Sequence, residues 1–360
     1  MKIRIKKKIK IIFLIIVVFL LVLSGLFIYE LSPVSSNKND VSFTVTKGST
    51  YISISKNLKE KNLIKSELFY KIYLKLVNKK GLEAGVYTLK ESMSVNDIIN
   101  SLSKGSNYNP DTVKITIPEG KKVKEIASII ALSTNHLEKD ILSVMDDYNF
   151  INDLINKYWF IKEDIKASGI GHPLEGYLFP DTYELLNKDV KVESIIYKML
   201  DRTDTILTKY KSDIEKSKYS IHELLTLASM VELEGLLDED RALIAGVFYN
   251  RLDINMALGS DVTSYYGYEI KLNKDLSKSE KIAALYDNNP YNTRGDLLGL
   301  PIGPICNPGE ASIKAAIYPK DSDYIYFIAN TCDESDHKTY FTVTYQEHLK
   351  NKDTYLTCEN

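Results

Sequence analysis

The sequence predicts a single N-terminal transmembrane helix followed by an α+β protein that lies outside the membrane. Strand-like runs, in which apolar residues alternate, stand apart from runs in which apolar residues recur with helical spacing. Separate runs of these two kinds indicate an α+β arrangement. A third kind of run, near the N-terminus, is apolar for 19 residues and is long enough to cross a membrane. The remaining chain is long enough for two or three units with a real core.

The transmembrane helix is predicted for residues 11–29, IIFLIIVVFLLVLSGLFIY. A helix of this length spans roughly 28 Å, which matches the hydrocarbon core of a bilayer. Residues 1–10, MKIRIKKKIK, contain six Lys or Arg and no acidic residue, so we expect them in the cytoplasm and everything after Glu30 outside the cell membrane. A cleaved signal peptide is the alternative, but the apolar run exceeds a usual signal-peptide core and no A-x-A site follows it.

Composition narrows the classes of partner. From Glu30 onward the chain carries 40 of its 46 basic side chains and all 48 acidic ones, and this mildly acidic balance argues against binding nucleic acid. Cys306, Cys332 and Cys358 are too few and too far apart for a disulfide scaffold or a zinc site, and they allow one disulfide of undetermined pairing. No metal motif or Gly-rich phosphate loop is present, so we expect no metal and no cofactor.

Residues 30–40 are polar and contain Pro and Ser, which is typical of a linker. Three passages then share one pattern, a strand-like run, a turn and an amphipathic helix, at 41–64, 85–105 and 113–133. In the first, Phe43 and Val45 alternate before the turn at Lys47-Gly48. Residues 41–105 together resemble the LysM-like module, which grips the polysaccharide cell wall. The alternative is a scaffold that only lifts the next domain away from the membrane.

Residues 106–165 are predicted to form a second β-turn-α unit and a helical arm. Ile115 and Ile117 alternate before the turn Pro118-Glu119-Gly120, and helical spacing follows. The chain's one tryptophan, Trp159, lies in the arm, where it is suited either to stacking on a sugar or to packing in the core.

The stretch from residue 220 to residue 235, SIHELLTLASMVELEG, predicts a helix with one acidic side chain on its buried face. Ser220 and Glu223 form a capping box at its start. At 100° per residue, Glu232 lies about 40° from the centre of the apolar stripe, whereas Glu223 and Glu234 lie about 120° or more away. A desolvated carboxyl has a raised pKa and is suited to act as a general acid. The structural alternative is an ion pair of Glu232 with Arg241 or Arg251.

Residues 166–350 contain six motifs in order: HPLEGYLFPDTYEL (172–185), LASMVELEG (227–235), VFYNRL (247–252), SDVTSYYG (260–267), YNTR (291–294) and GLPIGPICNPG (299–309). They resemble the YceG-like family of endolytic murein transglycosylases, and the resemblance extends from the N-terminal anchor to the end of the chain. It implies a YceG-like catalytic domain at 166–350 and a C-terminal tail at 351–360.

The resemblance implies a membrane-anchored lyase that cuts nascent peptidoglycan strands between N-acetylmuramic acid and N-acetylglucosamine. The cut leaves a 1,6-anhydro-muramyl end and terminates strand elongation. The family's catalytic Glu is the first of its V-E-x-E motif, here Glu232, which helical phase selects independently. A glycosidase needs two carboxylates. In the lyase the sugar's own C6 hydroxyl attacks, so Glu232 alone protonates the glycosidic oxygen and then accepts the hydroxyl proton. Penicillin-binding synthases of the elongation or division machinery are the implied partners.

Two groups of residues are expected to support Glu232. Those suited to bind sugar hydroxyls and N-acetyl groups, or to orient Glu232, are Glu175, Asp181, Asp261, Thr263, Tyr291 and Asn292. Those expected to shape a groove through fixed or positive φ angles are Pro301, Gly303, Pro304, Asn307, Pro308 and Gly309. The alternatives are that Asp181 caps a helix after Pro180 and that Asp261 stabilises its turn. Gly259 departs from the family, whose members usually carry Gln, which puts one polar groove contact in doubt.

A short helix at 311–317 and a closing hairpin, YIYFIAN (324–330) with TYFTVT (339–344), are expected after this loop, with His337 solvated in the turn. Two other functions stay open. One is a muramidase-type hydrolase that uses Glu232 with Glu175 or Asp261, and the other is a non-catalytic wall-binding scaffold.

Overall fold

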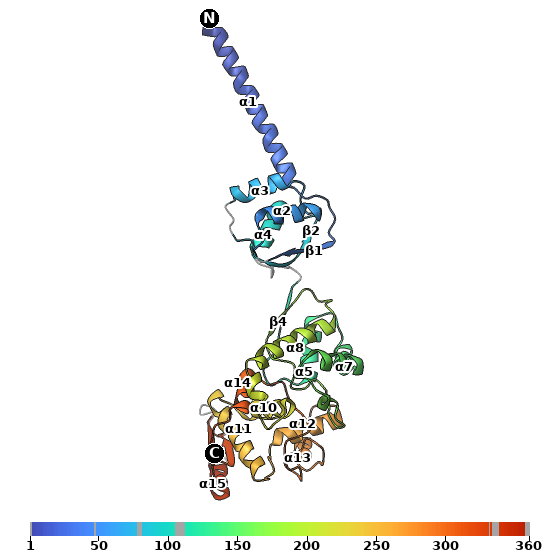
Figure 1. Ribbon diagram of the computed structural model, residues 1–360, viewed down its shortest axis with the longest axis vertical. Coiled ribbons are helices and arrows are strands. Elements are labelled where there is room, and N and C mark those ends of the chain that lie inside the picture. Colours follow the sequence, from blue (N-terminus) through green and yellow to red (C-terminus); the bar gives the residue numbers. More distant parts are fainter. Residues whose placement is uncertain are drawn as a thin grey trace. The chain divides into compact units, whose positions relative to one another are not determined.

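The computed structural model describes residues 2–46, 48–77, 81–104, 112–330, 332 and 338–356, with backbone alone for 2–13. The chain divides into two compact units, Met1–Thr112 and Val113–Asn360, and its elements are drawn in Figure 1. Each unit combines helices with short antiparallel strands, so the predicted α+β class is confirmed. The expected turns at Lys47 and His337 lie outside the described residues, as does Cys358.

The first unit begins with helix α1, Lys2–Leu31, which contains the predicted span. Its stretch Leu14–Leu31 is long and apolar enough to cross a membrane, and none of it is buried within the protein. The following segment is not a free tether. The backbone N–H groups of Val34 and Ser35 donate to the carbonyl of Glu91, and the Ser35 hydroxyl donates to the Glu91 carboxylate at 2.7 Å. The linker is therefore fastened to the body of the first unit.

The body of the first unit contains a strand, two helices, a second strand and a further helix. Its elements are β1 Asp40–Val45, α2 Tyr51–Glu60, α3 Glu67–Leu76, β2 Gly85–Lys90 and α4 Val95–Ser103. Strands β1 and β2 pair antiparallel, with Phe43 opposite Tyr87. Phe43 and Val45 are buried, as their alternation predicts. The helices α2 and α3 begin at Thr50 and Ser66, whose hydroxyls accept from a backbone N–H three residues on.

The second unit contains the remaining elements. They are β3 Val113–Thr116, α5 Val123–Ser133, α6 Glu138–Met145, α7 Tyr148–Lys157, a 3₁₀ turn Glu163–Lys166, β4 Thr182–Leu185, α8 Val192–Thr208, α9 Lys211–Ile214, α10 Ile221–Glu234, α11 Asp238–Asp253, α12 Asp261–Leu272, α13 Lys278–Ala284, α14 Glu310–Ile317, β5 Tyr326–Ala329, β6 Thr339–Thr342 and α15 Tyr345–Tyr355. The predicted short helix and closing hairpin are present as α14 and β5–β6, and α15 extends into the segment expected as a tail.

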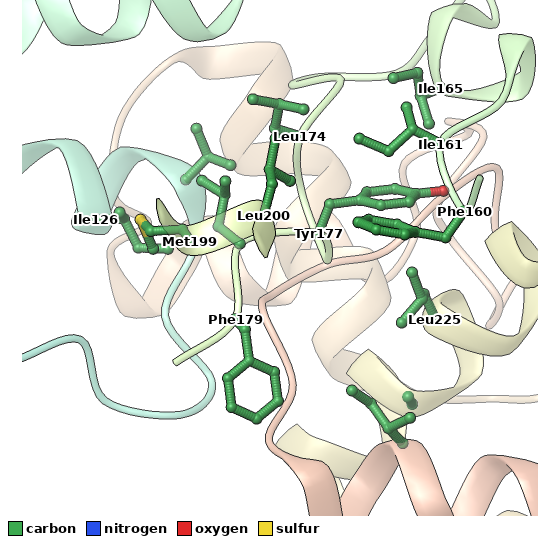
Figure 2. Packing of buried hydrophobic residues seen from close by; sticks show 14 of the residues in the cluster. Ile126, Phe160, Ile161, Ile165, Leu174, Tyr177, Phe179, Met199, Leu200 and Leu225 are labelled. Carbon is green, nitrogen blue, oxygen red and sulfur yellow. The ribbon is translucent and has the colours of Figure 1, made fainter. Parts of the chain in front are cut away.

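One hydrophobic core joins residues 113–165 to the rest of the second unit. Strand β3 pairs antiparallel with β4, placing Ile115 opposite Tyr183. The passage 172–185 was expected to lead directly into a helix, but its end forms β4 because Tyr183 and Leu185 alternate into the core. Figure 2 shows the rings of Phe160 and Tyr177 stacked in this core, with centroids 6.4 Å apart.

Trp159 packs against this core rather than standing free for a sugar. Its ring meets the edge of Phe160 at a centroid distance of 5.9 Å, and its Nε1–H donates to Asp204 at 2.7 Å. The structural alternative for this residue is therefore confirmed.

Replacing Leu200 by Ala should lower the free energy of unfolding of the second unit by about 2–5 kcal/mol, because Leu200 is fully buried and the change leaves a cavity. The measurement is urea unfolding followed by the fluorescence of Trp159, which reports this unit alone because the chain has one Trp. The control Leu132→Ala removes a side chain that is 88% exposed and should change this free energy by less than about 0.5 kcal/mol. Equal losses in both variants would contradict the assignment of the core.

Candidate active site

Helix α10 places Glu232 on its inner side, as predicted. The helix begins with the expected capping box, in which the Ser220 hydroxyl accepts from the Glu223 N–H and the Glu223 carboxylate accepts from the Ser220 N–H. The stripe residues Leu224, Ala228 and Val231 are buried. The side chain of Glu232 is only 6% exposed.

The surroundings of Glu232 are polar, which corrects the expected apolar pocket. Its Oε2 accepts from the Gly309 N–H at 3.0 Å and from the Ser312 hydroxyl at 2.7 Å. Its Oε1 accepts from Arg241 Nη2 at 3.3 Å. The alternative of an Arg241 ion pair is thus present together with the inward orientation. Arg251, the other candidate cation, instead donates to the carbonyls of Ile325 and Leu258.

Arg241 organises this polar cluster. Its guanidinium is almost fully buried and donates from Nε to Asp238 at 3.0 Å and from Nη1 to the Ser312 hydroxyl at 2.7 Å. Ser312 therefore accepts from Arg241 while donating to Glu232. Charge-assisted hydrogen bonds of this kind hold the carboxylate in one orientation at the junction of α10, α11 and α14.

The turn at residues 118–121 packs directly on Glu232. The Gly120 N–H donates to the Asn307 carbonyl, and the Asn307 N–H donates to the Lys121 carbonyl at 2.9 Å. Gly120 has a φ of +76°, and a Cβ at this position would lie 3.7 Å from Glu232 Cγ. A turn that the sequence assigns to a separate unit therefore forms one wall of the site.

Glu175 lies in the interior of the second unit, and the residue is only 2% exposed. It accepts from the Val123 N–H, the Tyr266 hydroxyl at 3.0 Å and the Asn307 side-chain amide at 2.8 Å. Burial raises its pKa to about 7, although these hydrogen bonds and the nearby His172 oppose the rise. Glu175 also lines a cavity of about 480 Å³, together with Lys122 and His172.

Three further predicted site residues are buried and hydrogen-bonded within the protein. The Tyr291 hydroxyl accepts from the Gly171 N–H, and its ring meets Tyr266 edge-on at 4.9 Å. Asn292 accepts from the Ser264 hydroxyl at 2.7 Å, and the Thr263 hydroxyl donates to the Ser260 carbonyl at 2.7 Å. These three side chains therefore make hydrogen bonds with the protein's own backbone and side chains.

Asp181 and Asp261 are more exposed, and each forms an ion pair. Asp181 pairs with Arg202 at 2.7 Å and accepts from the Thr182 N–H, so it precedes strand β4 and caps no helix. Asp261 is the first residue of α12 and pairs with Arg294.

The loop 301–309 is buried against α10, but Gly303 and Gly309 do not act through positive φ as expected. Gly309 has a φ of −76°, and Gly303 is not in the positive-φ region. Neighbouring side chains approach both closely, His222 at Gly303 and Glu119 at Gly309. Asn307 holds the loop in place, since its Oδ1 accepts from the Leu178 N–H at 2.8 Å. Pro301, Pro304 and Pro308 are buried beside them.

Glu234 is a site residue that sequence reasoning missed. Helical phase placed it away from the buried stripe, but its carboxylate accepts from the Ser260 hydroxyl at 2.6 Å. Burial, with the nearby charge of Asp261, raises its pKa. It borders a cavity of about 580 Å³ together with Asp261 and Gly259, whose φ is +66°. The sequence feature that could have indicated Glu234 is its position as the second Glu of the V-E-x-E motif.

Two of the three cysteines, Cys306 and Cys332, lie in the part of the chain that is described. Cys306 is a free, buried thiol whose Sγ–H donates to the Ser229 carbonyl, whereas Cys332 is disulfide-bonded. Among the described residues, no group of three or more His, Cys, Asp or Glu side chains is arranged to hold a metal ion.

The fold and the site together define an α+β protein with one buried, ion-paired carboxylate suited to acid–base chemistry. The chain belongs to the YceG-like family, which matches residues 43–354. It is 37% identical over 345 residues to the endolytic murein transglycosylase of Bacillus subtilis, covering 94% of this chain and 92% of that protein.

Two further relatives extend the comparison. The endolytic murein transglycosylase of Streptococcus pneumoniae serotype 2 is 36% identical, and the match covers 93% of this chain but 63% of that longer protein. The crystal structure of a YceG-like protein of Listeria monocytogenes is 38% identical and superposes with a TM-score of 0.61, covering 88% of this chain and all of that one.

The buried carboxyl of Glu175 should make stability depend on pH. Its pKa of about 7 in the folded protein lies above the ordinary value of 4.5, so the folded state favours the protonated form. The contribution is complete below pH 4.5 and is lost as pH rises through 7. Between pH 5 and 8 it should remove roughly 3 kcal/mol, and Glu175→Gln should lack this part of the slope.

The measurement is the free energy of urea unfolding, followed by Trp159 fluorescence, at several pH values for the wild type and Glu175→Gln. Glu215→Gln, which removes an exposed carboxylate in a loose pair with Lys211, is the control and should keep the wild-type slope. Parallel curves for Glu175→Gln and the wild type would show that another group causes the dependence.

Proposed function

We propose that this protein is a membrane-anchored endolytic lytic transglycosylase of peptidoglycan. It cleaves the glycan between N-acetylmuramic acid and N-acetylglucosamine and leaves a 1,6-anhydro-muramyl end, which terminates elongation of nascent strands. The observation that carries the proposal is the position of Glu232, an inward-facing carboxyl in a family whose relatives are named endolytic murein transglycosylases.

In this mechanism Glu232 first protonates the glycosidic oxygen as a general acid. Its carboxylate then accepts the proton of the C6 hydroxyl as that oxygen attacks the anomeric carbon. The donors from Gly309, Ser312 and Arg241 stabilise the carboxylate formed between these two steps and keep it oriented. The sugar supplies its own nucleophile, so no second carboxylate has to activate water.

We propose that some of the predicted site residues contact the sugar directly and that others support the wall of the binding groove. Asp181 and Asp261, which are partly exposed, contact hydroxyl or N-acetyl groups directly. Glu175, Thr263, Tyr291 and Asn292 are buried and hold the groove wall, together with the 301–309 loop. The cavity of about 580 Å³ that Glu234 and Asp261 line is large enough to hold sugar residues.

The first unit serves as an anchor and a wall contact in this proposal. Helix α1 spans the membrane with its basic end in the cytoplasm, which places the second unit outside, where peptidoglycan lies. The strand, two helices and closing strand of residues 41–105 form a LysM-like module that either binds glycan or spaces the catalytic unit from the membrane. Penicillin-binding synthases of the elongation or division machinery are the proposed partners.

Incubating the full chain in detergent with uncrosslinked glycan strands should yield internal fragments that end in 1,6-anhydro-muramic acid, detected by mass spectrometry. Glu232→Gln should lower the rate by about 10²–10⁴-fold, since a general acid contributes this much. Glu215→Gln, an exposed carboxylate on another surface, should retain the wild-type rate. Reducing muramic acid ends would favour a muramidase, and no cleavage by the wild type at any pH would favour a scaffold.

The orientation of α1 is testable by cysteine labelling in intact cells. A membrane-impermeant maleimide should label Lys38→Cys, an exposed position after the helix, and should label Lys8→Cys only after lysis. The unmodified chain gives the background from its own cysteines. Labelling of position 8 in intact cells would overturn the proposed topology.

A further inference from the structure

A second carboxylate, that of Glu119, lies beside the same glycine that binds Glu232. A Cβ built on Gly309 would lie 1.9 Å from Glu119 Oε1, so this carboxylate rests directly on the glycine backbone. The N–H of that same Gly309 donates to Glu232 Oε2 at 3.0 Å. The two carboxyl groups therefore flank one residue. Glu119 lies in the turn after β3 and Glu232 lies in α10, more than 100 residues away in the sequence.

The turn that carries Glu119 is held in this place by the backbone. Residues 118–121 follow strand β3, and hydrogen bonds between Gly120 and Asn307 and between Asn307 and Lys121 fasten them to the loop that ends at Gly309. Glu119 is nevertheless an exposed residue. Glu232, by contrast, is enclosed.

The charges that face Glu119 are mixed. They are the carboxylate of Glu232 from α10 and the side chains of Asp238 and Arg241 from α11. Partial burial raises the pKa of Glu119, the charge of Glu232 raises it further, and Arg241 opposes both. Two neighbouring carboxyl groups resist simultaneous ionisation, and their protons belong to the pair rather than to either residue.

We propose that Glu119 is a positioning residue for the reaction proposed above: with Glu232 it forms a carboxyl pair that retains one proton for delivery to the glycosidic oxygen. The inference rests on the proposed function. Glu232 accepts hydrogen bonds from three donors, and one of them, the Gly309 N–H, belongs to the residue on which the Glu119 carboxyl rests. Two carboxyl groups that share one residue in this way disfavour ionisation of both together, so one proton stays with the pair.

The proton count of the pair balances over one turnover. One proton leaves the pair for the glycosidic oxygen as the bond to the anomeric carbon breaks. The C6 hydroxyl then loses its proton to Glu232 as its oxygen forms the new bond to the anomeric carbon. The pair regains the single proton with which it began, and no further reactant is required.

A charge series at position 119 tests the pair through the pH profile of cleavage. With one negative charge removed, the pair releases its proton at lower pH, so the alkaline limb should move to lower pH by about one unit in Glu119→Gln. This shift equals about a tenfold loss of rate at a fixed pH on that limb. Glu119→Lys should move the limb further in the same direction, and Glu215→Gln should not move it.

A lower rate with an unmoved limb, or equal shifts for Gln and Lys, would reduce Glu119 to a structural residue and overturn the inference. A second measurement does not depend on cleavage. Carboxyl ¹³C NMR titration of the full chain in detergent should show the pKa of Glu119 falling in Glu232→Gln, because the charge that raises it is gone. An unchanged Glu119 titration refutes the pair, whereas absence of anhydro products from the wild type refutes the proposed function instead.

Discussion

The buried guanidinium of Arg241 is the interaction on which the rest of the site depends. A buried cation is costly unless acceptors surround it, and those available come from three helices. Asp238 lies at the start of α11, Glu232 at the end of α10 and Ser312 in α14. Satisfying one cation therefore brings these helix ends together and fixes the direction of the Glu232 carboxylate. The order of the α10–α14 junction and the geometry of the site are two results of the same pairing.

The position of Glu232 could be predicted from the sequence because it depends on local rules. A capping box sets the first residue of α10, and the helical repeat then sets which side chains face inward. The surroundings of Glu232 could not be predicted in this way. Gly309 and Ser312 are 77 and 80 residues away along the chain, and no local pattern shows which backbone N–H or hydroxyl will meet the carboxylate.

The predicted sugar-binding residues show a second limit of sequence reasoning. Carboxylates, amides and hydroxyls that suit a sugar also suit buried backbone groups, and residue type alone does not separate the two uses. Glu175 accepts a backbone N–H, and Asn292 donates to the Asp287 carbonyl at 2.7 Å, so both satisfy the protein itself. Glu234 shows the opposite failure. Helical phase measures position relative to the apolar stripe, but Ser260, the residue just before α12, donates a hydrogen bond to Glu234 from another side.

The acid–base role proposed for Glu232 accounts for a site that combines hydrogen-bond donors with a nearby carboxylate. A residue that serves as both acid and base must release a proton easily and take one back easily, so neither of its forms can be strongly favoured. Arg241, Ser312 and the Gly309 N–H donate hydrogen bonds to Glu232, and the Glu119 carboxyl lies beside the same glycine, where the charge of Glu232 raises the pKa of Glu119. Gly309 is where the two influences meet, because its N–H serves one carboxyl and its missing side chain leaves room for the other. A larger residue there would preserve the backbone donor but displace Glu119, which separates the two effects within a single position.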